Sequence, residues 1–357
     1  MILVTGGAGF IGSSFVNACL AAGRGPVIVV DVLSYSGSLK NLESVIARPD
    51  FHFRKLDIGD SAAMDAVLHE FQPRAIVNFA AETHVDRSIL GPRAFFATNV
   101  DGTLSLLEAA RNYWTGLEAS PQREFRFLHV STDEVYGALS EAEPAFTETS
   151  RYAPNSPYAA SKAASDHMVR AWFRTYGLPT LTVNCSNNYG PRQFPEKLIP
   201  LMFACALAGK DLPIYGDGRQ VRDWLFVDDH VAALCAVLDR GRVGEVYNVG
   251  GGNQISTLEV VGQLCALLDE LRPRAGGRYQ DLIRFVADRP GHDRRYAIDS
   301  SKIQSELGWQ PQVEFASGLR RTLVWYLENL AWLAAANGVS HQEWLAANYS
   351  GRTGAAR

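Results

Sequence analysis

The chain has 357 residues and a formal net charge of −4; 47% of its residues are hydrophobic and 20% are charged. This balance is typical of a globular protein with a sizeable core, and it lacks the basic footprint of a nucleic-acid-binding protein. No apolar run reaches the roughly 18 residues that a membrane span requires. We therefore expect neither a nucleic acid nor a membrane as a partner.

The cysteine pattern indicates the compartment. The five cysteines are odd in number and widely spaced, and no two of them form a C-x-x-C pair. A disulfide framework and a zinc site are therefore not expected, and we predict buried thiols and no metal. The sequence opens directly into an apolar run without the pattern of a signal peptide. These features predict a cytoplasmic protein.

Short β-branched runs alternate with helical patterns in the first half of the chain. The runs that predict strands cover residues 2–5, 27–31, 52–56, 75–79, 127–131 and 180–184. Apolar residues at helical spacing predict helices over residues 12–22, 62–71 and 98–113. This alternation predicts an α/β protein with a doubly wound parallel sheet of the Rossmann type.

The pattern changes after residue 186, where prolines and glycines interrupt the alternation. Strand and helix signals return over residues 224–238 and 246–249. We predict that residues 1–185 with about 222–250 form the large sheet domain. A smaller mixed α/β domain would consist of about 186–221 with 251–357. The apolar spacing over residues 324–348 predicts a packing helix.

A glycine-rich loop joins the first predicted strand to the first predicted helix. Gly7, Gly9 and Gly12 fit the pattern G-x-G-x-x-G, and Gly6 with Gly9 and Gly12 fits G-x-x-G-x-x-G. Glycines allow the backbone to turn tightly and to approach a pyrophosphate, which then lies at the helix N-terminus. The strand–loop–helix context is the one that a dinucleotide site requires.

Two aspartates follow the next strands. Asp31 lies 19 residues after Gly12, at the end of the second predicted strand. A carboxylate there binds the ribose hydroxyls and repels a 2′-phosphate, and no basic residue follows before Lys40. The sequence therefore predicts NAD rather than NADP. Asp57 follows the third strand and fits either a contact to the adenine or a turn.

Two adjacent acids, Asp133 and Glu134, follow an apolar run and a hydroxyl pair that ends with Thr132. Residues at the carboxyl end of a strand in such a sheet face the ligand crevice. Carboxyl groups there can serve as general acid and general base in one site. The alternative is a charge pair that stabilises a helix N-terminus.

Tyr158 and Lys162 stand four residues apart and share a face if the segment is helical. Free tyrosine has a pKa of about 10, too high for a base at neutral pH. A nearby cation and a positively charged nicotinamide would favour the phenolate. Thr132 precedes Tyr158 by 26 residues, so both reach one substrate hydroxyl only if the fold brings them together.

The glycine loop, the Ser-Thr pair and the Tyr–Lys pair together resemble the extended short-chain dehydrogenase/reductase family. Further segments resemble the dTDP-glucose 4,6-dehydratases of that family, nearly from end to end: residues 80–88, 99–103, 186–191, 195–200, 222–224, 289–296 and 344–352. The pair Asp133–Glu134 distinguishes this likeness, because the related sugar-nucleotide 4-epimerases usually lack both acids there.

The resemblance implies a mechanism. Tyr158, supported by Lys162 and Thr132, would deprotonate the glucose 4-hydroxyl while NAD takes the hydride from C4. Glu134 would then remove the C5 proton, and Asp133 would protonate the departing C6 hydroxyl. The hydride would return to C6, so NAD would be regenerated in each turnover. Two differently tuned carboxyl groups suit this division of labour.

The resemblance also assigns binding residues. The NAD shell would comprise Gly6, Gly9, Phe10, Ile11, Gly12, Asp31, Ser34, Asp57, Ile58, Ala80, Ala81, Thr83, Thr98, Tyr158 and Lys162. The dTDP-glucose site would comprise Thr83, His84, Thr132, Asn187, Lys197, Leu198, Pro213, Tyr215, Arg222, Thr257, Arg289 and His292. Arg222 is the best pyrophosphate ligand on physical grounds, because a guanidinium binds phosphate oxygens bidentately. A structural role for His84 and a surface ion pair between Arg222 and its neighbour Asp223 are the alternatives.

Two positions depart from the family pattern. Thr257 replaces an asparagine and Arg192 replaces an aromatic residue or histidine, so a 4,6-dehydratase or 4-epimerase of another nucleotide sugar, such as UDP-glucose, stays open. A catalytically silent NAD-binding regulator would show an eroded catalytic position, and none is eroded here.

The family likeness also implies a homodimer. A group of apolar residues in the segment after Lys162 fits either a dimer seam or the core. The group is Met168, Val169, Trp172 and Phe173.

Overall fold

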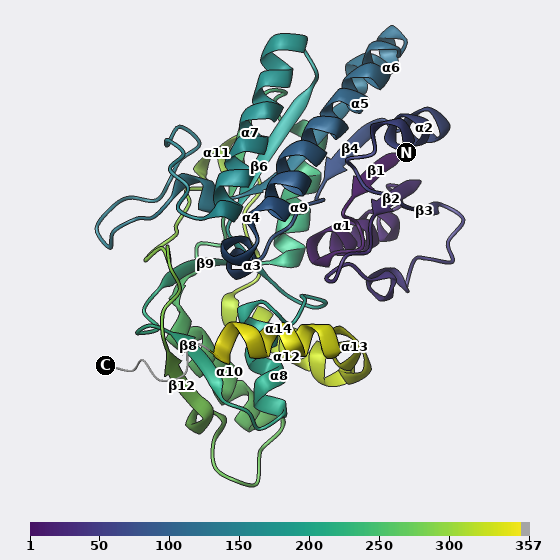
Figure 1. Cartoon of the computed structure of the whole chain (residues 1–357). Helices are drawn as coiled ribbons and strands as arrows, with labels where there is room; N and C mark the ends of the chain where they lie inside the picture. Colours follow the sequence, from purple (N-terminus) through teal and green to yellow (C-terminus); the bar gives the residue numbers. More distant parts are fainter. Residues whose placement is uncertain (351–357) are drawn as a thin grey trace.

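The computed structural model describes residues 1–350, apart from the side chains of residues 339–342, 347 and 350. Its largest feature is a seven-stranded sheet in which every pairing is parallel, in the order β10-β6-β5-β4-β1-β2-β3. The strands are β1 (Ile2–Thr5), β2 (Val27–Asp31), β3 (Phe51–Lys55), β4 (Ala75–Asn78), β5 (Arg126–Thr132), β6 (Thr180–Cys185) and β10 (Val246–Val249). The predicted doubly wound fold is confirmed (Figure 1).

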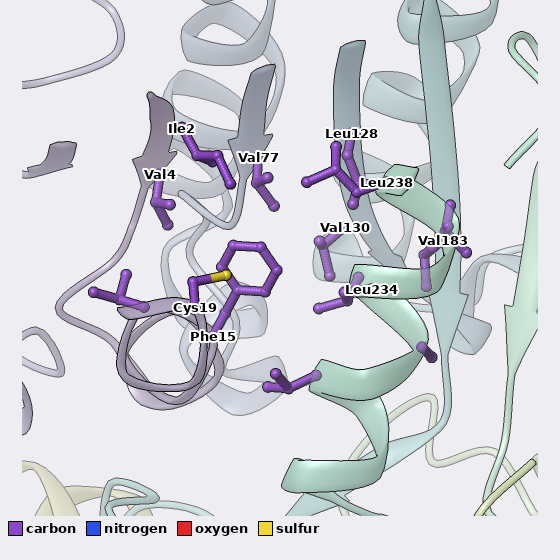
Figure 2. Packing of buried hydrophobic residues seen from close by; sticks show 14 of the residues in the cluster. Ile2, Val4, Phe15, Cys19, Val77, Leu128, Val130, Val183, Leu234 and Leu238 are labelled. Atoms are coloured by element: carbon purple, nitrogen blue, oxygen red, sulfur yellow. The ribbon is translucent and has the colours of Figure 1, made fainter. Parts of the chain in front are cut away.

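Helices cover both faces of this sheet because successive strand residues point to opposite sides. Ile2 and Val4 of β1 belong to one buried cluster, whereas Leu3 belongs to another. The first face carries α1 (Phe10–Ala21), α9 (Val227–Arg240) and α11 (Ser301–Leu307). The second face carries α2 (Ser61–Phe71), α5 (Thr103–Thr115) and α7 (Pro157–Tyr176). Figure 2 shows α1 and α9 packing side chains such as Phe15 and Leu234 against the strands.

A smaller mixed α/β part lies beyond the large sheet, in the lower half of Figure 1. It holds a three-stranded sheet of β7 (Asn187–Tyr189), β9 (Val221–Phe226) and β11 (Gln254–Ser256), and a pair formed by β8 (Leu212–Tyr215) and β12 (Ile283–Val286). Its helices are α8 (Leu198–Leu207), α10 (Thr257–Leu271), α12 (Phe315–Glu328), α13 (Leu330–Ala336) and α14 (Val339–Ser350). Phe203, Phe226 and Tyr326 belong to its own buried cluster.

Short elements complete the described chain: η1 (Leu39–Leu42), α3 (Val85–Leu90), α4 (Pro92–Phe95), η2 (Phe96–Gly102), α6 (Ala119–Glu124), η3 (Asp133–Tyr136) and η4 (Tyr279–Leu282). Near the boundary predicted at about residue 222, β9 still pairs with β7 and β11. The chain returns to the large sheet only with α9. Residues 351–357, the end of the predicted second domain, lie outside the described residues, as do Gly351 and Arg352 of the closing family segment.

Two predicted helices differ from the observed ones. The helix predicted over residues 98–113 is a π-helix, η2, that continues into the α-helix α5 from Thr103. The packing helix predicted over residues 324–348 is three helices, because α12 ends at Glu328 and α13 ends at Ala336. Both differences arise from backbone geometry that an apolar spacing does not encode.

Three of the four apolar residues singled out on α7 pack in the core. Val169 is fully buried in the cluster on the second face of the sheet, and Met168 and Trp172 pack against it. Among residues 1–350, no helix combines the length and the apolar character that crossing a bilayer demands.

One buried histidine predicts a pH dependence of stability. His230 on α9 is fully buried, and burial lowers its pKa to about 3. Below about pH 6.5 the unfolded chain binds a proton at His230, whereas the folded chain does not. The free energy of unfolding therefore decreases as the pH is lowered through that window. We expect this site to cost roughly 2 kcal/mol between pH 7 and pH 5.

The variant His230→Gln should lose less unfolding free energy than the parent over that pH interval, measured by urea denaturation. The exposed variant His69→Gln is the control. Equal pH slopes for the parent and His230→Gln would contradict the assignment.

Candidate active site

A cavity of about 300 Å³ opens at the carboxyl ends of the central strands. Every residue predicted to contact NAD lines it, from the glycine loop to Tyr158 and Lys162. Thr132, Asp133 and Glu134 line it as well. The position is the crevice at which open parallel sheets bind ligands.

The glycine loop owes its shape to close backbone packing. Gly6 has φ of +65°, and a Cβ there would lie 2.6 Å from the backbone nitrogen of Ala80. A Cβ at Gly12 would overlap the carbonyl oxygen of Gly6. Gly9 is different, because its Cβ would meet only that oxygen, at 3.3 Å. Gly6 and Gly12 therefore fix the turn, while Gly9 leaves its cavity side open to a close ligand.

Backbone N–H groups hold the Asp31 carboxyl in place at the end of β2. Its Oδ2 accepts a hydrogen bond from Ala8 N at 2.9 Å, and its Oδ1 accepts one from Leu33 N at 2.7 Å. Burial raises the pKa of Asp31, and these two donors oppose that effect. An oriented carboxyl at this cavity wall fits the ribose of NAD. Asp57 has the turn role, because it accepts from Gly59 N at 2.8 Å, and it also lines the cavity, where a contact to the adenine stays a prediction.

Asp133 and Glu134 begin the short helix η3, and Thr132 caps it. Asp133 is only 1% exposed, and its Oδ2 makes no hydrogen bond within residues 1–350. Burial raises the pKa of Asp133 well above its usual range, and the neighbouring carboxyls of Glu134 and Asp223 raise it further. Both acids lie in the first turn of η3, where the alternative interpretation placed them. The burial of Asp133 at the cavity wall is not typical of a charge pair that only stabilises a helix N-terminus.

Glu134 experiences a different environment. Burial raises its pKa, but three cations, Arg289, Arg222 and Lys197, act in the opposite direction. Those cations favour the ionised carboxylate. The net effect raises the pKa of both acids, but cations are the main opposing influence at Glu134, whereas neighbouring carboxyls add to the effect of burial at Asp133. Two adjacent acids in different environments suit a general acid beside a general base.

Tyr158 is buried next to Thr132 and both acids. Burial raises the pKa of the Tyr158 phenol well above 10, and Glu134 adds to that effect, while the Thr132 hydroxyl opposes it. The fold therefore brings Thr132 and Tyr158 together, as the sequence required. Lys162 Nζ donates to Val130 O at 2.8 Å, one helical turn from Tyr158.

The predicted substrate residues separate into two groups. Thr83, Thr132, Asn187 and Lys197 line the cavity. The others lie outside its lining: His84, Leu198, Pro213, Tyr215, Arg222, Thr257, Arg289 and His292. Two residues of the second group are joined through Asp86, which accepts from Tyr215 OH at 2.8 Å and from Arg289 Nη1 at 3.4 Å.

Arg222 is buried, and its guanidinium donates to Val221 O at 2.8 Å and to Asp293 O at 2.9 Å. The alternative of a surface ion pair with Asp223 is therefore wrong. Arg222 also lies over the ring of Tyr296, with 4.2 Å between the guanidinium carbon and the ring centroid. A buried cation that acts on Glu134 can attract an anionic group into the same space.

Two other predicted residues have structural partners. His84 caps α3, accepting from Arg87 N at 3.3 Å, and its other ring nitrogen lies 3.3 Å from Glu196 O. Thr257 donates to Gln220 O at 3.4 Å. In the described structure these contacts give His84 a structural role, and Thr257 faces the turn before β9.

Sequence reasoning missed several residues that line the cavity, and Asn188, Gln193, Phe194 and Glu196 are examples. Glu196 accepts from Tyr35 OH at 2.9 Å and from Arg87 Nε at 3.0 Å, so it ties the loop after β2 to α3. Two of these residues could have been found from the sequence because they are next to predicted substrate residues: Asn188 follows Asn187, and Glu196 precedes Lys197.

Comparison with known proteins agrees with this geometry. Residues 3–322 match the family model described as GDP-mannose 4,6 dehydratase. The chain belongs to the GDP-mannose 4,6-dehydratase family.

Within this family, a dTDP-glucose 4,6-dehydratase of Xanthomonas campestris pv. campestris (strain B100) is 60% identical over 93% of this chain and 94% of its own length. A dTDP-glucose 4,6-dehydratase of Shigella flexneri is 54% identical over 98% of this chain and 99% of its own length. Among solved structures, the dTDP-glucose 4,6-dehydratase DesIV from Streptomyces venezuelae, with NAD bound, is 48% identical with a TM-score of 0.85. The match covers 94% of this chain and 99% of the DesIV chain.

The cations around Glu134 predict a pH effect. If Glu134 acts as a carboxylate base, kcat falls as the pH drops through its pKa. Replacing Arg289 by Met removes the cation that acts most strongly on Glu134. We expect the acid limb of the kcat profile to move to higher pH by about half a unit to one unit.

The control is Arg320→Met, which removes an exposed guanidinium paired with Glu270. Its profile should match that of the parent. An acid limb in Arg289→Met that coincides with the parent's, measured at saturating substrate, would argue against Glu134 as the base.

Proposed function

We propose that Tyr158, Thr132, Asp133, Glu134 and Lys162 carry out the reaction of an NAD-dependent dTDP-glucose 4,6-dehydratase on this chain. The substrate is dTDP-glucose and the product is its 4-keto-6-deoxy derivative, a step of deoxysugar biosynthesis. NAD, when bound, takes up hydride from C4 and later delivers it to C6, so no net oxidant is needed.

The chain's own groups then move protons. Tyr158 accepts the proton of the 4-hydroxyl. Thr132 forms a hydrogen bond with the same hydroxyl. The 4-ketone acidifies the C5 proton, and Glu134 removes it. Asp133 gives its proton to the C6 hydroxyl, which leaves as water. Glu134 returns a proton to C5 when C6 is reduced.

One observation supports this division most strongly: the contrast between the two adjacent acids. Burial and two neighbouring carboxyls raise the pKa of Asp133 well above its usual range, with Arg222 opposing them, which favours the neutral form. Burial also raises the pKa of Glu134, but there Arg289, Arg222 and Lys197 all oppose the effect. A group that must donate a proton and a group that must accept one suit these different environments.

The binding of the two ligands follows the two parts of the chain. The residues of 1–185 with about 222–250 would hold NAD, and those of about 186–221 with 251–357 would hold the nucleotide sugar. The seven-stranded sheet and α9 support the first assignment. The cations Lys197 and Arg289, which suit a diphosphate, support the second.

The proposal includes a homodimer in the cytoplasm. Leu90 of α3 is 72% exposed and Phe96 of η2 is 42% exposed, and both belong to segments packed against α7. These two side chains support a contact with a second copy beside α7. All five cysteines are free thiols, which suits a reducing compartment.

The roles are tested by Asp133→Asn. The amide cannot donate a carboxyl proton, so water loss should slow by two to four orders of magnitude. Oxidation at C4 involves Tyr158 instead and should continue. We expect absorbance at 340 nm to rise to nearly one NADH per active site after dTDP-glucose is added, and to persist.

The control is Asp229→Asn, a buried aspartate on α9 that accepts from the backbone of Gln312 and Val313. It should turn over dTDP-glucose without NADH accumulation. Full turnover by Asp133→Asn would contradict the role of Asp133. Turnover of UDP-glucose in preference to dTDP-glucose by the parent would contradict the substrate.

A further inference from the structure

Behind Lys162 lies a buried polar network that the mechanism above does not use. Asp166 stands four residues after Lys162 on α7 and is 5% exposed, and His129 of β5 is fully buried. His129 Nε2 lies 3.5 Å from Lys162 Nζ and 3.4 Å from Asp166 Oδ1. The imidazole thus stands between the ammonium and the carboxyl.

Hydrogen bonds assign the proton on this imidazole. Thr5 Oγ1 donates to Asn78 Oδ1 at 2.6 Å, so the amide nitrogen of Asn78 is free to donate. That nitrogen lies 3.1 Å from His129 Nδ1, which must then be the acceptor. The ring proton is therefore on Nε2, the nitrogen that faces Asp166. The chain of contacts begins at Thr5, directly before the glycine loop.

The other oxygen of Asp166 is held by hydroxyl groups. Its Oδ2 accepts from Ser131 Oγ at 2.8 Å and from Tyr152 OH at 3.0 Å. Asn184 in turn donates to Tyr152 OH at 3.1 Å. The Asp166 carboxyl therefore accepts from β5 and from the loop before α7 through one oxygen, while its other oxygen lies nearest to His129.

A buried ammonium such as that of Lys162 is costly without a carboxyl nearby. Burial lowers the pKa of Lys162, and Asp166 is the strongest influence in the opposite direction, followed by Cys185 of β6. The titratable groups around the ammonium are therefore Asp166 on α7, His129 on β5 and Cys185 on β6, and Tyr158 stands one turn before Lys162 on α7. Of these, Asp166 is the carboxyl.

We propose that Asp166 is a positioning residue that keeps Lys162 in its ammonium form beside Tyr158, with His129, Ser131 and Tyr152 holding the carboxylate in place. The inference deepens the proposed function and rests on Tyr158 as the base at C4. Without the Asp166 charge, Lys162 would lose its proton at lower pH, and Tyr158 would lose the cation that favours its phenolate.

The test is the pH profile of the NADH burst in the Asp133→Asn background, which isolates the step at C4. Adding Asp166→Asn should move the basic limb of the burst rate to lower pH by about one unit or more, because a buried cation has lost its anion. At pH 8 the burst rate should fall at least tenfold. The burst amplitude at pH 6.5, where Lys162 keeps its proton, should remain.

Asp229→Asn in the same background is the matched control, since it also converts a buried aspartate to its amide, and its limb should not move. A basic limb of Asp166→Asn that stays in place would overturn the proposal, even if the rate falls, since a structural defect lowers the rate at every pH. Absence of any burst in the Asp133→Asn parent would instead refute the proposed function.

A second variant decides the matter if Asp166→Asn does not fold. Ser131→Ala with Tyr152→Phe removes both hydroxyl donors from Asp166 and leaves its carboxyl in place. The basic limb should then shift in the same direction by a smaller amount. An unshifted limb in this folded variant would overturn the proposal.

Discussion

The withdrawal of charged groups from water at one edge of the parallel sheet governs this molecule. Asp133 and Lys162 are buried, and Glu134 is partly buried, where β5 ends or where α7 passes it. An isolated charge in such a place is costly, so each group either gives up its charge or acquires a partner. At Asp133 the neighbouring carboxyls of Glu134 and Asp223 add to the effect of burial on the pKa, whereas at Glu134 the cations Arg289, Arg222 and Lys197 oppose it. The proposed division of labour between the two acids rests on this difference.

The partners come from distant parts of the chain, which explains why the fold needs two parts. Arg222 is carried by β9 and Arg289 follows β12, while Glu134 follows β5 of the large sheet. The return of the chain through α9 and β10 attaches the smaller part to the sheet. Contacts such as Trp332 Nε1 donating to Asn41 Oδ1 at 2.9 Å join the C-terminal helices to the segment after β2. The cavity is therefore shaped by both parts.

Local sequence was sufficient for the features that depend on local geometry. The strands of the large sheet and the glycine loop could be predicted because period and turn chemistry are local. The π-helix η2 could not, because its apolar spacing resembles that of an α-helix. The burial of Arg222 and the anchoring of Glu196 by Tyr35 also escaped, since each depends on residues far away in the chain. Asp166 carried a faint signal, four residues beyond Lys162 on the same helix face, but its partners His129 and Ser131 lie on β5.

The most direct test of the central claim follows a single hydrogen. Purified protein, with no cofactor added, is incubated with dTDP-glucose carrying deuterium at C4, and the product is analysed by mass spectrometry and NMR. If Asp133 and Glu134 act beside an NAD that stays bound and returns the hydride it takes from C4, the product is the 4-keto-6-deoxy sugar. It carries the deuterium at C6 and one solvent hydrogen at C5. A product whose deuterium has been lost to solvent, or no product from dTDP-glucose, would contradict that claim.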